Sequence, residues 1–242
     1  MSLGNGVKLT WIGHASFILD TPGGKRALID PWMTGNPVCP ESLHDPGDVD
    51  LILLSHGHSD HTGDVLRLAR DKSPAAVICM IELGDYLGSK GVENIIGGNK
   101  GGTLTAEGIS VTLTHAFHSS SYGEEDGTIV YTGEPAGLII TLENGYRIYF
   151  AGDTTVFGDM RLIGDLYAPD VAILPIGGHY TMGPREAALA VELLGAKEIV
   201  PIHHGTFPIL GGTPAQLRTE LDARSLNDVR IHALEPGASV TR

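Results

Sequence analysis

The chain contains little of what several classes of protein need. Only two of its 242 residues are cysteine, and Cys39 and Cys79 lie far apart with no motif around either. We therefore expect free thiols, as in a reducing cytoplasm, rather than a disulfide framework or a cysteine metal site. No apolar stretch approaches the ~18 residues of a membrane span, and no signal-peptide pattern opens the chain. These absences predict a cytoplasmic protein.

Cationic side chains are also scarce. The sequence has 16 lysines and arginines against 29 aspartates and glutamates, which leaves a net charge of −13 at pH 7. Proteins that bind long nucleic acids normally carry a basic patch, and none is visible here. The same charge disfavours anionic membrane surfaces. The expected partner is a small-molecule substrate, while apolar sheet edges leave a homo-oligomer open.

Linkers, low-complexity segments and repeats of fixed period are missing as well. The length suits one large α/β domain, and the 33 glycines alternate with apolar runs, as in tight turns after strands. We therefore expect a single domain over residues 1–242. The chain also has no Gly-x-Ser-x-Gly motif, so nothing indicates a serine nucleophile.

Histidine, by contrast, is concentrated in one place. The run Ser55-His56-Gly57-His58-Ser59-Asp60-His61 holds three imidazoles and a carboxylate, and it follows an apolar stretch over residues 49–54 that we interpret as a buried strand. Zinc, manganese and iron bind these ligand types well. Without a cation, this many polar groups would be left unsatisfied. The run therefore predicts a metal site.

The run is predicted to serve two metal ions. His56 and His58 lie two residues apart and can face one point as the chain leaves the strand. Asp60 and His61 lie on the turn into a helix that we expect to start near Asp64, and they can face a second point. Two metals roughly 3.5–4 Å apart are the usual arrangement for hydrolysis. Four ligands cannot fill two such sites, so the remaining ligands must come from elsewhere.

Three further ligand-type residues follow β-rich segments. His118 comes after residues 109–114, Asp153 after 146–150, and His203 after 198–202. Polar groups at the ends of strands are the expected construction of an active site in an α/β protein.

Taken together, these motifs resemble the metallo-β-lactamase superfamily, and in particular its small, single-domain metal-dependent hydrolases. The resemblance extends from about Trp11 to Pro208. Its supporting segments are Trp11–His14, Leu28–Pro31, Ala151–Thr154, Leu174–Pro184 and Pro201–Pro208. It implies an αβ/βα sandwich of four layers, with a dinuclear centre at one edge.

The resemblance also implies a ligand set. One metal would take His56, His58 and His118, the other Asp60, His61 and His203, and Asp153 would bridge them. The ions would be two divalent metals, with zinc favoured and manganese, iron or nickel open. Two departures from relatives, His204 in place of a tyrosine and Gly178 in place of an acidic residue, concern the substrate pocket and not the ligands.

The other histidines allow more than one interpretation. His115 competes with His118 as a ligand, but it continues the strand alternation and is expected to point into the sheet packing. His14 is either a hydrogen-bond partner beneath the metals or a structural histidine. His179, in a Gly-Gly loop, is a candidate to contact substrate or to stabilise negative charge. His44 is expected to be exposed and His232 to be structural.

The element pattern completes the expectation. Strands are predicted to dominate residues 7–54 and to return at 109–114, 129–142, 146–150, 171–176 and 198–202. One helix is predicted from Pro184 to Leu194, with Gly195 at its end, and another opens at Thr213-Pro214. The loop from Pro31 to Asp48 is either a lid or a passive surface loop.

The predicted activity is metal-assisted hydrolysis of an ester, lactone or phosphodiester by metal-activated hydroxide. Asp60 would hold a metal and orient the nucleophile, with His179 as the second catalytic candidate. A di-iron redox protein is the first alternative, but such relatives need a flavin partner and a ligand set richer in carboxylates. A metal-binding scaffold without catalysis is the second alternative, and the seven retained ligand-type residues disfavour it.

Overall fold

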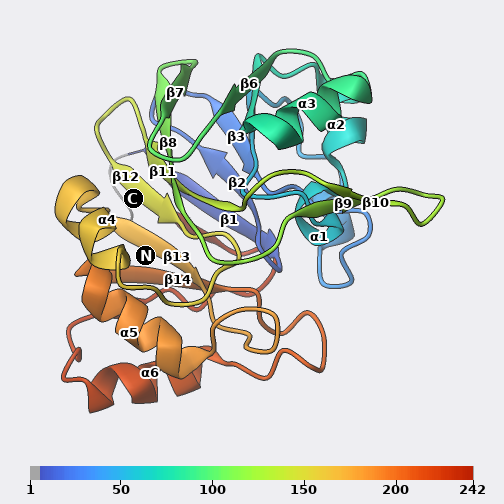
Figure 1. Ribbon diagram of the computed structural model, residues 1–242. Coiled ribbons are helices and arrows are strands. Elements are labelled where there is room, and N and C mark those ends of the chain that lie inside the picture. The colour runs from blue at the N-terminus through green and yellow to red at the C-terminus, as the bar shows by residue number, and fades with distance from the viewer. Residues whose placement is uncertain (1–5, 242) are drawn as a thin grey trace.

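The computed structural model describes residues 6–241 as two large mixed sheets with helices on their outer faces (Figure 1). The first sheet has seven strands in the order β16 (Ser239–Thr241), β1 (Lys8–Gly13), β2 (Ser16–Asp20), β3 (Arg26–Ile29), β4 (Leu51–Leu53), β5 (Ala76–Met80) and β6 (Ile95–Gly98). The second has seven strands in the order β15 (Arg230–Ile231), β14 (Glu198–Ile202), β13 (Val171–Pro175), β12 (Arg147–Phe150), β11 (Ala136–Thr141), β8 (Ile109–His115) and β7 (Thr103–Ala106).

Each sheet changes from antiparallel to parallel pairing along its width. In the first sheet, β1, β2 and β3 are antiparallel neighbours, whereas β3 to β6 run parallel. In the second, β7, β8, β11 and β12 are antiparallel, and β12 to β15 run parallel. Parallel strands need crossover connections, and helices supply most of them. The carboxyl ends of the parallel strands therefore carry the loops in which ligand-type residues were expected.

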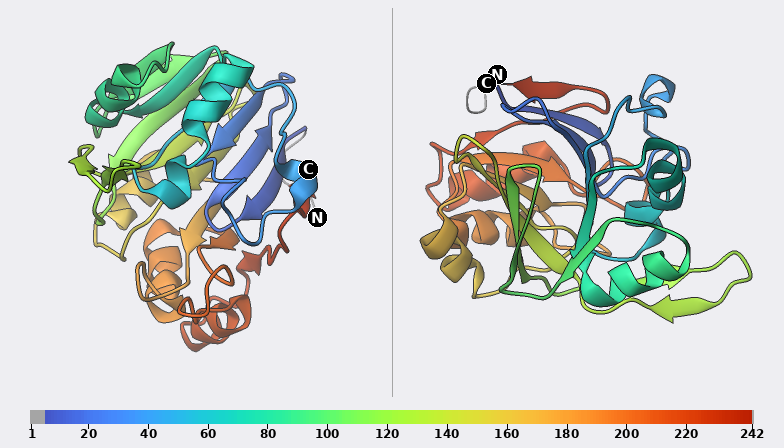
Figure 2. Two further views of the ribbon diagram at one scale, coloured as in Figure 1. Left: turned by 90° about the vertical axis from the view of Figure 1, so that its right-hand side faces the viewer. Right: turned by 90° about the horizontal axis from the view of Figure 1, so that it is seen from above.

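The helices form two outer layers. Next to the first sheet lie α1 (Ser59–Thr62), α2 (Val65–Lys72) and α3 (Ile81–Ser89), and next to the second lie α4 (Met160–Tyr167), α5 (Pro184–Leu194) and α6 (Pro214–Ala223). The order helix, sheet, sheet, helix is visible from above in Figure 2. The predicted four-layer αβ/βα sandwich is confirmed.

Three apolar clusters hold these layers together. The largest lies between the two sheets, where Phe17 and Phe150 meet edge to face with ring centroids 6.4 Å apart. A second cluster joins the second sheet to α4, α5 and α6 through residues such as Leu217. A third joins the first sheet to α2 and α3 through residues such as Leu68. Because both sheets are covered on both faces, their strands are nearly continuous apolar runs instead of alternating ones.

The predicted helix ends are confirmed where a specific cap was expected. Helix α5 begins at Pro184, and Gly195 follows its last residue with a left-handed φ of 65°. Thr213 caps α6, since its hydroxyl accepts a hydrogen bond from the backbone N–H of Gln216. These signals could be found in the sequence because a helix cap depends on only a few neighbouring residues.

Some predicted elements were wrong. Residues 129–142 are not one strand: β10 (Ile129–Tyr131) pairs with β9 (Ser121–Gly123) in a separate hairpin, and β11 starts only at Ala136. Between them Gly133 adopts a φ of 80°, and Pro135 has no N–H to donate to a sheet. The helix expected near Asp64 is preceded by α1, so Asp60 and His61 lie on a short helix rather than in a turn.

The loop over residues 31–48 is held to the first layer. The buried carboxylate of Asp64 accepts hydrogen bonds from the backbone N–H groups of Met33 and Thr34, and from the Thr34 hydroxyl. Arg67 donates to the same carboxylate. These bonds fix the start of the loop, and with it the position of Trp32.

None of the helices among residues 6–241 has the length and apolar character needed to cross a membrane.

Candidate metal centre

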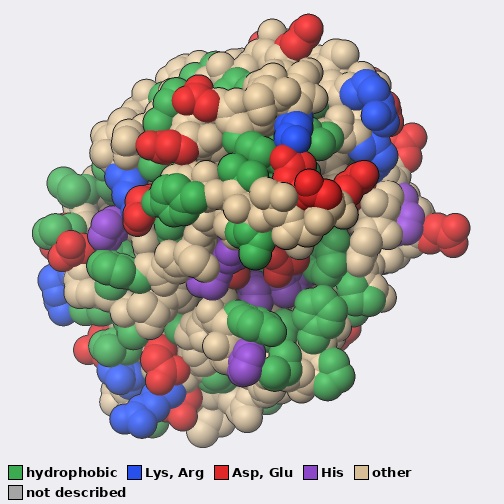
Figure 3. All heavy atoms as spheres, turned by 45° about the vertical axis from the view of Figure 1, so that its right-hand side comes forward, with side chains coloured by type: hydrophobic (Ala, Val, Ile, Leu, Met, Phe, Trp, Pro, Cys, Tyr) green, Lys and Arg blue, Asp and Glu red, His purple; other side chains and the backbone are tan. Residues whose placement is uncertain are grey.

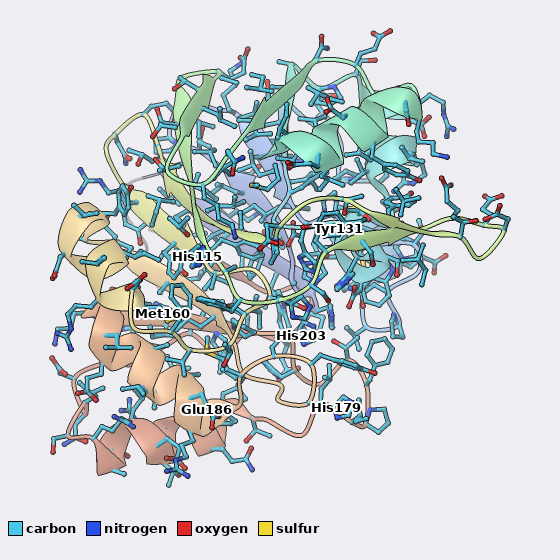
Figure 4. All side chains as sticks on the ribbon, in the orientation of Figure 1. His115, Tyr131, Met160, His179, Glu186 and His203 are labelled. Atoms are coloured by element: carbon cyan, nitrogen blue, oxygen red, sulfur yellow. The ribbon has the colours of Figure 1, made fainter. Side chains whose placement is uncertain are left out.

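Ligand-type side chains from both sheets meet at one edge of the sandwich. His56, His58, Asp60 and His61 follow β4 in the first sheet. His118, Asp153 and His203 follow β8, β12 and β14 in the second sheet. Figure 4 labels His203, which directly follows β14.

The first group consists of His56, His58 and His118, whose ligating atoms lie within 4.8 Å of one another. The Nε2 of His56 and the Nδ1 of His58 are 3.0 Å apart. Two nitrogens on one tetrahedral ion lie about 3.3 Å apart at ordinary Zn–N distances. This spacing fits two ligands of a shared ion. His118, which was predicted as the ligand in preference to His115, is the histidine that lies with His56 and His58 in this group.

The second group consists of His14, Asp60, His61 and His203, again with one ligating atom of each within 4.8 Å of the others. Three of these residues were predicted to share a metal. His14, for which the sequence allows either a structural role or a hydrogen bond beneath the metals, lies beside Asp60.

Asp153 lies between the two groups. Its Oδ2 is 3.1 Å from the Nε2 of His203 and 3.5 Å from the Nε2 atoms of both His61 and His118. It therefore contacts members of each group, as a bridging carboxylate would. Burial alone would raise the pKa of Asp153, but the surrounding His203 and His61 hold it well below its ordinary value.

Asp30 determines which nitrogen of His61 faces Asp153. The Asp30 carboxylate, fully buried, accepts hydrogen bonds from the backbone N–H and hydroxyl of Ser55, and it lies 2.7 Å from the His61 Nδ1. With its Nδ1–H donated to Asp30, His61 presents the Nε2 lone pair to Asp153. Among residues 6–241, neither this Nε2 nor the Asp153 Oδ1 has a hydrogen-bond partner, although both are buried.

The Nε2 of His61 and the Oδ2 of Asp153, 3.5 Å apart, repel as two acceptors unless a cation lies between them. Burial alone would lower the pKa of His61, but Asp153, Asp30 and Asp60 raise it well above its ordinary value, so a proton takes this place when no metal is bound and a metal ion can replace it. A divalent metal would satisfy the lone pairs of His61 and Asp153 together, and imidazole with carboxylate is a donor set that such ions take readily. The residues present therefore fit the metal that the sequence predicted.

His14 positions Asp60. It is fully buried, its Nε2 is 3.0 Å from Asp60 Oδ2, and its Nδ1 is 3.0 Å from the Thr206 hydroxyl. Burial lowers the pKa of His14 to about 4, so the ring is neutral at pH 7. A carboxylate can only accept, so Nε2–H donates to Asp60 and the Thr206 hydroxyl donates to Nδ1.

The backbone at the centre is locally strained. His14, Asp30 and His203 have φ values of 56°, 44° and 56°, in the left-handed region that non-glycine residues rarely adopt. Each such residue costs on the order of 1–3 kcal/mol and persists only where its surroundings hold it. Gly177 helps to hold His203, because a Cβ at position 177 would lie 1.9 Å from the His203 carbonyl oxygen. Close packing around these turns thus holds the strained backbone in place and directs the side chains to the centre.

Several predicted histidines lie away from the cluster. His115 ends β8 exposed, with its ring 4.6 Å from that of Phe117, so the expectation that it points into the sheet packing was wrong. His44 is half-buried and not exposed. The expectation for His232 agrees with its buried contact with Glu198 at 2.9 Å. His179 is exposed and packs against Tyr180, apart from His203 in Figure 4.

His204 and Gly178, the two residues at which the sequence differs from the pattern expected of relatives, lie outside the cluster. His204 packs against Trp11, with ring centroids 5.2 Å apart, and burial lowers its pKa to about 4. Gly178 has a left-handed φ of 71° and faces open space. Neither residue displaces a member of the cluster.

A cavity of about 500 Å³ adjoins the cluster, and Asp60 belongs to both. Its other lining residues are Trp32, Ser59, Tyr180, Phe207 and Ile209. Figure 3 shows histidine side chains at the bottom of a hollow on this face, with hydrophobic side chains beside it.

Sequence reasoning missed Asp30, Ser55 and Thr206 as supporting residues. Asp30 offered a signal, because it is a carboxylate directly after a predicted strand, like Asp153. Ser55 and Thr206 gave none, since a hydroxyl in a loop is common and its partner is set by the fold.

Comparison with known proteins agrees with this construction. A family model described as the beta-lactamase superfamily domain matches residues 25–204, which include His56 and His203. A UPF0173 metal-dependent hydrolase of Rubrobacter xylanophilus is 50% identical over 233 residues, covering 96% of this chain and 95% of that protein. The solved structure of Igni18, a metallo hydrolase of the archaeon Ignicoccus hospitalis, shares 38% identity and superposes with a TM-score of 0.84 over 97% of each chain. An isothiocyanate hydrolase from Delia radicum gut bacteria shares 26% identity, with a TM-score of 0.72 over 97% of this chain and 98% of that one.

Proposed function

Since the chain belongs to the beta-lactamase superfamily and is a metal-dependent hydrolase, we propose that its centre holds two divalent metal ions and hydrolyses an ester, lactone or phosphodiester. The resemblance found in the sequence motifs is thereby confirmed at the level of the family and of the general activity. The bond type, the number of metals and their identity belong to the proposal.

The observation that carries the proposal is the position of Asp153. Its carboxylate contacts His118 from the first group and His61 and His203 from the second. A carboxylate shared by two groups of ligands is what a two-metal site needs. We assign His56, His58 and His118 to one ion and Asp60, His61 and His203 to the other, with Asp153 between them. Zinc suits this mixture of nitrogen and oxygen ligands.

The bound metals would lower the pKa of a shared water from about 15.7 toward 7 and polarise the substrate oxygen. The protein's own residues position this chemistry. Burial would raise the pKa of Asp60, but His61 and the hydrogen bond from His14 hold it below its ordinary value. Asp60 is therefore ionised at neutral pH. His14 contacts only the Oδ2 of Asp60, so Oδ1 can accept a hydrogen bond from a water molecule and orient it.

His179 is proposed to act on the substrate rather than on the metals. Its ring packs against Tyr180, which lines the cavity beside Asp60. A substrate that fills the cavity and extends past Tyr180 would come close to this ring. We expect His179→Ala to raise KM more than it lowers kcat.

The remaining proposals concern the setting of the enzyme. Residues 1–242 are proposed to act as one domain on a small-molecule substrate, without a nucleic-acid partner, since the net charge is −13. Cys39 and Cys79 are free thiols, which supports a cytoplasmic location. A homo-oligomer is compatible with this activity.

The test is hydrolysis of a lactone, a carboxylic ester and a phosphodiester by protein reconstituted with zinc or manganese, with metal content measured on the same samples. The control is His58→Ala, prepared identically. Two metal equivalents and turnover of one bond type, both reduced in the variant, support the proposal. Equal activity in the two proteins contradicts it, and bound iron with oxygen consumption would favour redox chemistry instead.

A further inference from the structure

The cavity beside Asp60 is suited to hold the part of a substrate that does not react. Its volume of about 500 Å³ lies in the range of small-molecule sites, which is about 300–1,000 Å³. Asp60 belongs both to its wall and to the second group of ligands. A substrate whose scissile bond reaches the cluster would therefore place an adjoining group in this cavity.

Four of the six residues that line the cavity, Trp32, Tyr180, Phe207 and Ile209, form an apolar wall beside the polar Ser59 and Asp60. Tyr180, Phe207 and Ile209 are 58%, 39% and 50% exposed, although large apolar side chains are normally buried. Neighbouring exposed apolar residues indicate a binding surface more often than isolated ones do. Trp32 adds a half-buried indole, with its ring centroid 6.2 Å from that of Phe207.

The aromatic wall is preformed. A Cβ on Gly63 would lie 2.6 Å from Trp32 Cδ1, and a Cβ on Gly35 would lie 2.8 Å from Trp32 Nε1. The indole thus packs against two glycines that leave room for it. The wall is also continuous with the metal centre, because the ring of His14 contacts both Trp32 and Phe207, at centroid distances of 5.3 and 6.0 Å. Because the Trp32 indole is already held in place, little of its side-chain entropy is lost when a ligand binds against it.

No cation lines this cavity in the part of the chain that the structure describes. Its lining residues include one charged side chain, the carboxylate of Asp60. On the face shown in Figure 3, no lysine or arginine borders the hollow that contains the histidines. The metal ions proposed for the cluster would offset the charge of Asp60, so the argument concerns the part of the cavity beyond the cluster, where an anionic group would lose hydration against apolar side chains and find no side-chain cation to pair with.

We propose that this protein selects substrates in which the group beside the scissile bond is uncharged and apolar, namely alkyl or aryl esters and lactones, and that it discriminates against anionic side groups. The inference rests on the proposed hydrolase function. Phe207 and Ile209 determine this specificity, and the lack of a lining lysine or arginine disfavours substrates whose side group ends in a carboxylate or phosphate.

The first test compares kcat/KM for para-nitrophenyl acetate, butyrate and hexanoate with that for the para-nitrophenyl half-ester of adipate, which matches hexanoate in chain length but ends in a carboxylate. We expect about a threefold to fourfold gain per added methylene, as apolar burial predicts. The adipate half-ester should be at least tenfold poorer than hexanoate. Equal values for these two substrates would overturn the proposal.

Variants of the wall separate this explanation from a general hydrophobic effect. Phe207→Ser should flatten the dependence on chain length. Ile209→Lys should shift the ratio of adipate to hexanoate turnover about tenfold toward adipate. Leu166→Ala is the matched control, because Leu166 is 72% exposed but lies on α4 and does not line the cavity. A similar ratio in wild type and Ile209→Lys would show that the side group does not occupy this cavity.

A binding measurement tests the cavity without turnover. Saturation-transfer NMR with metal-loaded protein should detect phenethyl alcohol, and Phe207→Ser should lose that signal. The para-sulfonate of the same alcohol should bind at least tenfold more weakly. If no ester is hydrolysed but phenethyl alcohol binds as described, the proposed function fails and the apolar cavity stands. If esters are hydrolysed and the two alcohols bind equally, the function stands and this inference fails.

Discussion

Two imidazoles at the candidate metal centre, those of His61 and His14, face a different neighbour with each of their two nitrogens. His61 directs Nδ1 to Asp30 and Nε2 toward Asp153, and His14 directs Nε2 to Asp60 and Nδ1 to Thr206. The partner on one nitrogen determines the tautomer and therefore what the other nitrogen can do. His61 is left with a lone pair for a metal, whereas His14 has both nitrogens committed and is a positioning residue.

The choice between two nearby histidines gives the first prediction. His118→Ala should lower the bound metal by about one equivalent and abolish turnover, because His118 reaches both Asp153 and the group of His56 and His58. His115→Ala is the control, since His115 is exposed and packs on Phe117. Inductively coupled plasma mass spectrometry on both variants decides the assignment. Loss of metal in His115→Ala, with His118→Ala unchanged, would reverse it.

A second prediction concerns the free thiols. Burial raises the pKa of Cys79 to about 12 and that of Cys39 to about 11, and Cys79 is fully buried. A thiol with a pKa near 12 is about 10⁻⁴ ionised at pH 8, and the thiolate is the reactive form. We therefore expect Ellman's reagent to react slowly with Cys39 in the native protein and to reach Cys79 only after unfolding.

The control for this experiment is Cys39→Ser. Folded Cys39→Ser protein should show no thiol that reacts with the reagent. After unfolding in denaturant, one thiol, that of Cys79, should react. Rapid reaction of Cys79 in the native variant would mean that β5 opens far more readily than its burial indicates.

At the scale of elements, a glycine at the end of a helix and a glycine inside a helix have different roles. Gly195 closes α5 with a φ of 65°, whereas Gly88 lies within α3 at an ordinary φ. A Cβ on Gly88 would lie 3.5 Å from the nearest side-chain atom, an ordinary contact distance. The same substitution should therefore have opposite effects at the two positions.

We predict that Gly195→Ala lowers the free energy of unfolding by about 1 kcal/mol, because alanine is strained in the left-handed region. Gly88→Ala should raise it by about 0.5–1 kcal/mol through helix propensity and the reduced entropy of the unfolded chain. Urea denaturation followed by circular dichroism measures both. Destabilisation by Gly88→Ala would show that α3 packs more tightly than described.

At the scale of the whole molecule, the candidate centre joins the two halves of the sandwich. The run from His56 to His61 comes from the first sheet, and His118, Asp153 and His203 come from the second. Bound metal would therefore stabilise the packing of one sheet on the other. It would also relieve the repulsion between buried acceptors on both sides.

Metal removal should accordingly lower the melting temperature of the protein. A ligand at a thousand times its Kd stabilises the native state by about 4 kcal/mol. For a domain of this size, each kcal/mol corresponds to about 2–4 °C. Differential scanning calorimetry before and after dialysis against a chelator should show a fall of about 10 °C, reversed by added zinc. An unchanged melting temperature after verified metal loss would contradict a centre that links the sheets.

Much of the architecture could be predicted because its causes are local. The caps of α5 and α6 depend on residues within one turn, and the buried strands appear as continuous apolar runs. The split of residues 129–142 had a local signal in Gly133 and Pro135, but the run of β-type residues outweighed it in the prediction. The exposed position of His115 had no such signal, because a strand's last residue can leave the alternation of its neighbours.

The sequence by itself determined the kinds of ligand and their places after strands, since chain order places these residues at the ends of their own elements. Only the tertiary structure decided the partners. The His61–Asp30 contact joins residues 31 positions apart, and the His14–Asp60 contact joins residues 46 apart. The apolar walls of the cavity likewise come from distant segments, with Trp32 in one and Phe207 in another. Such contacts depend on how two sheets pack, and packing is a property of the whole chain rather than of any local pattern.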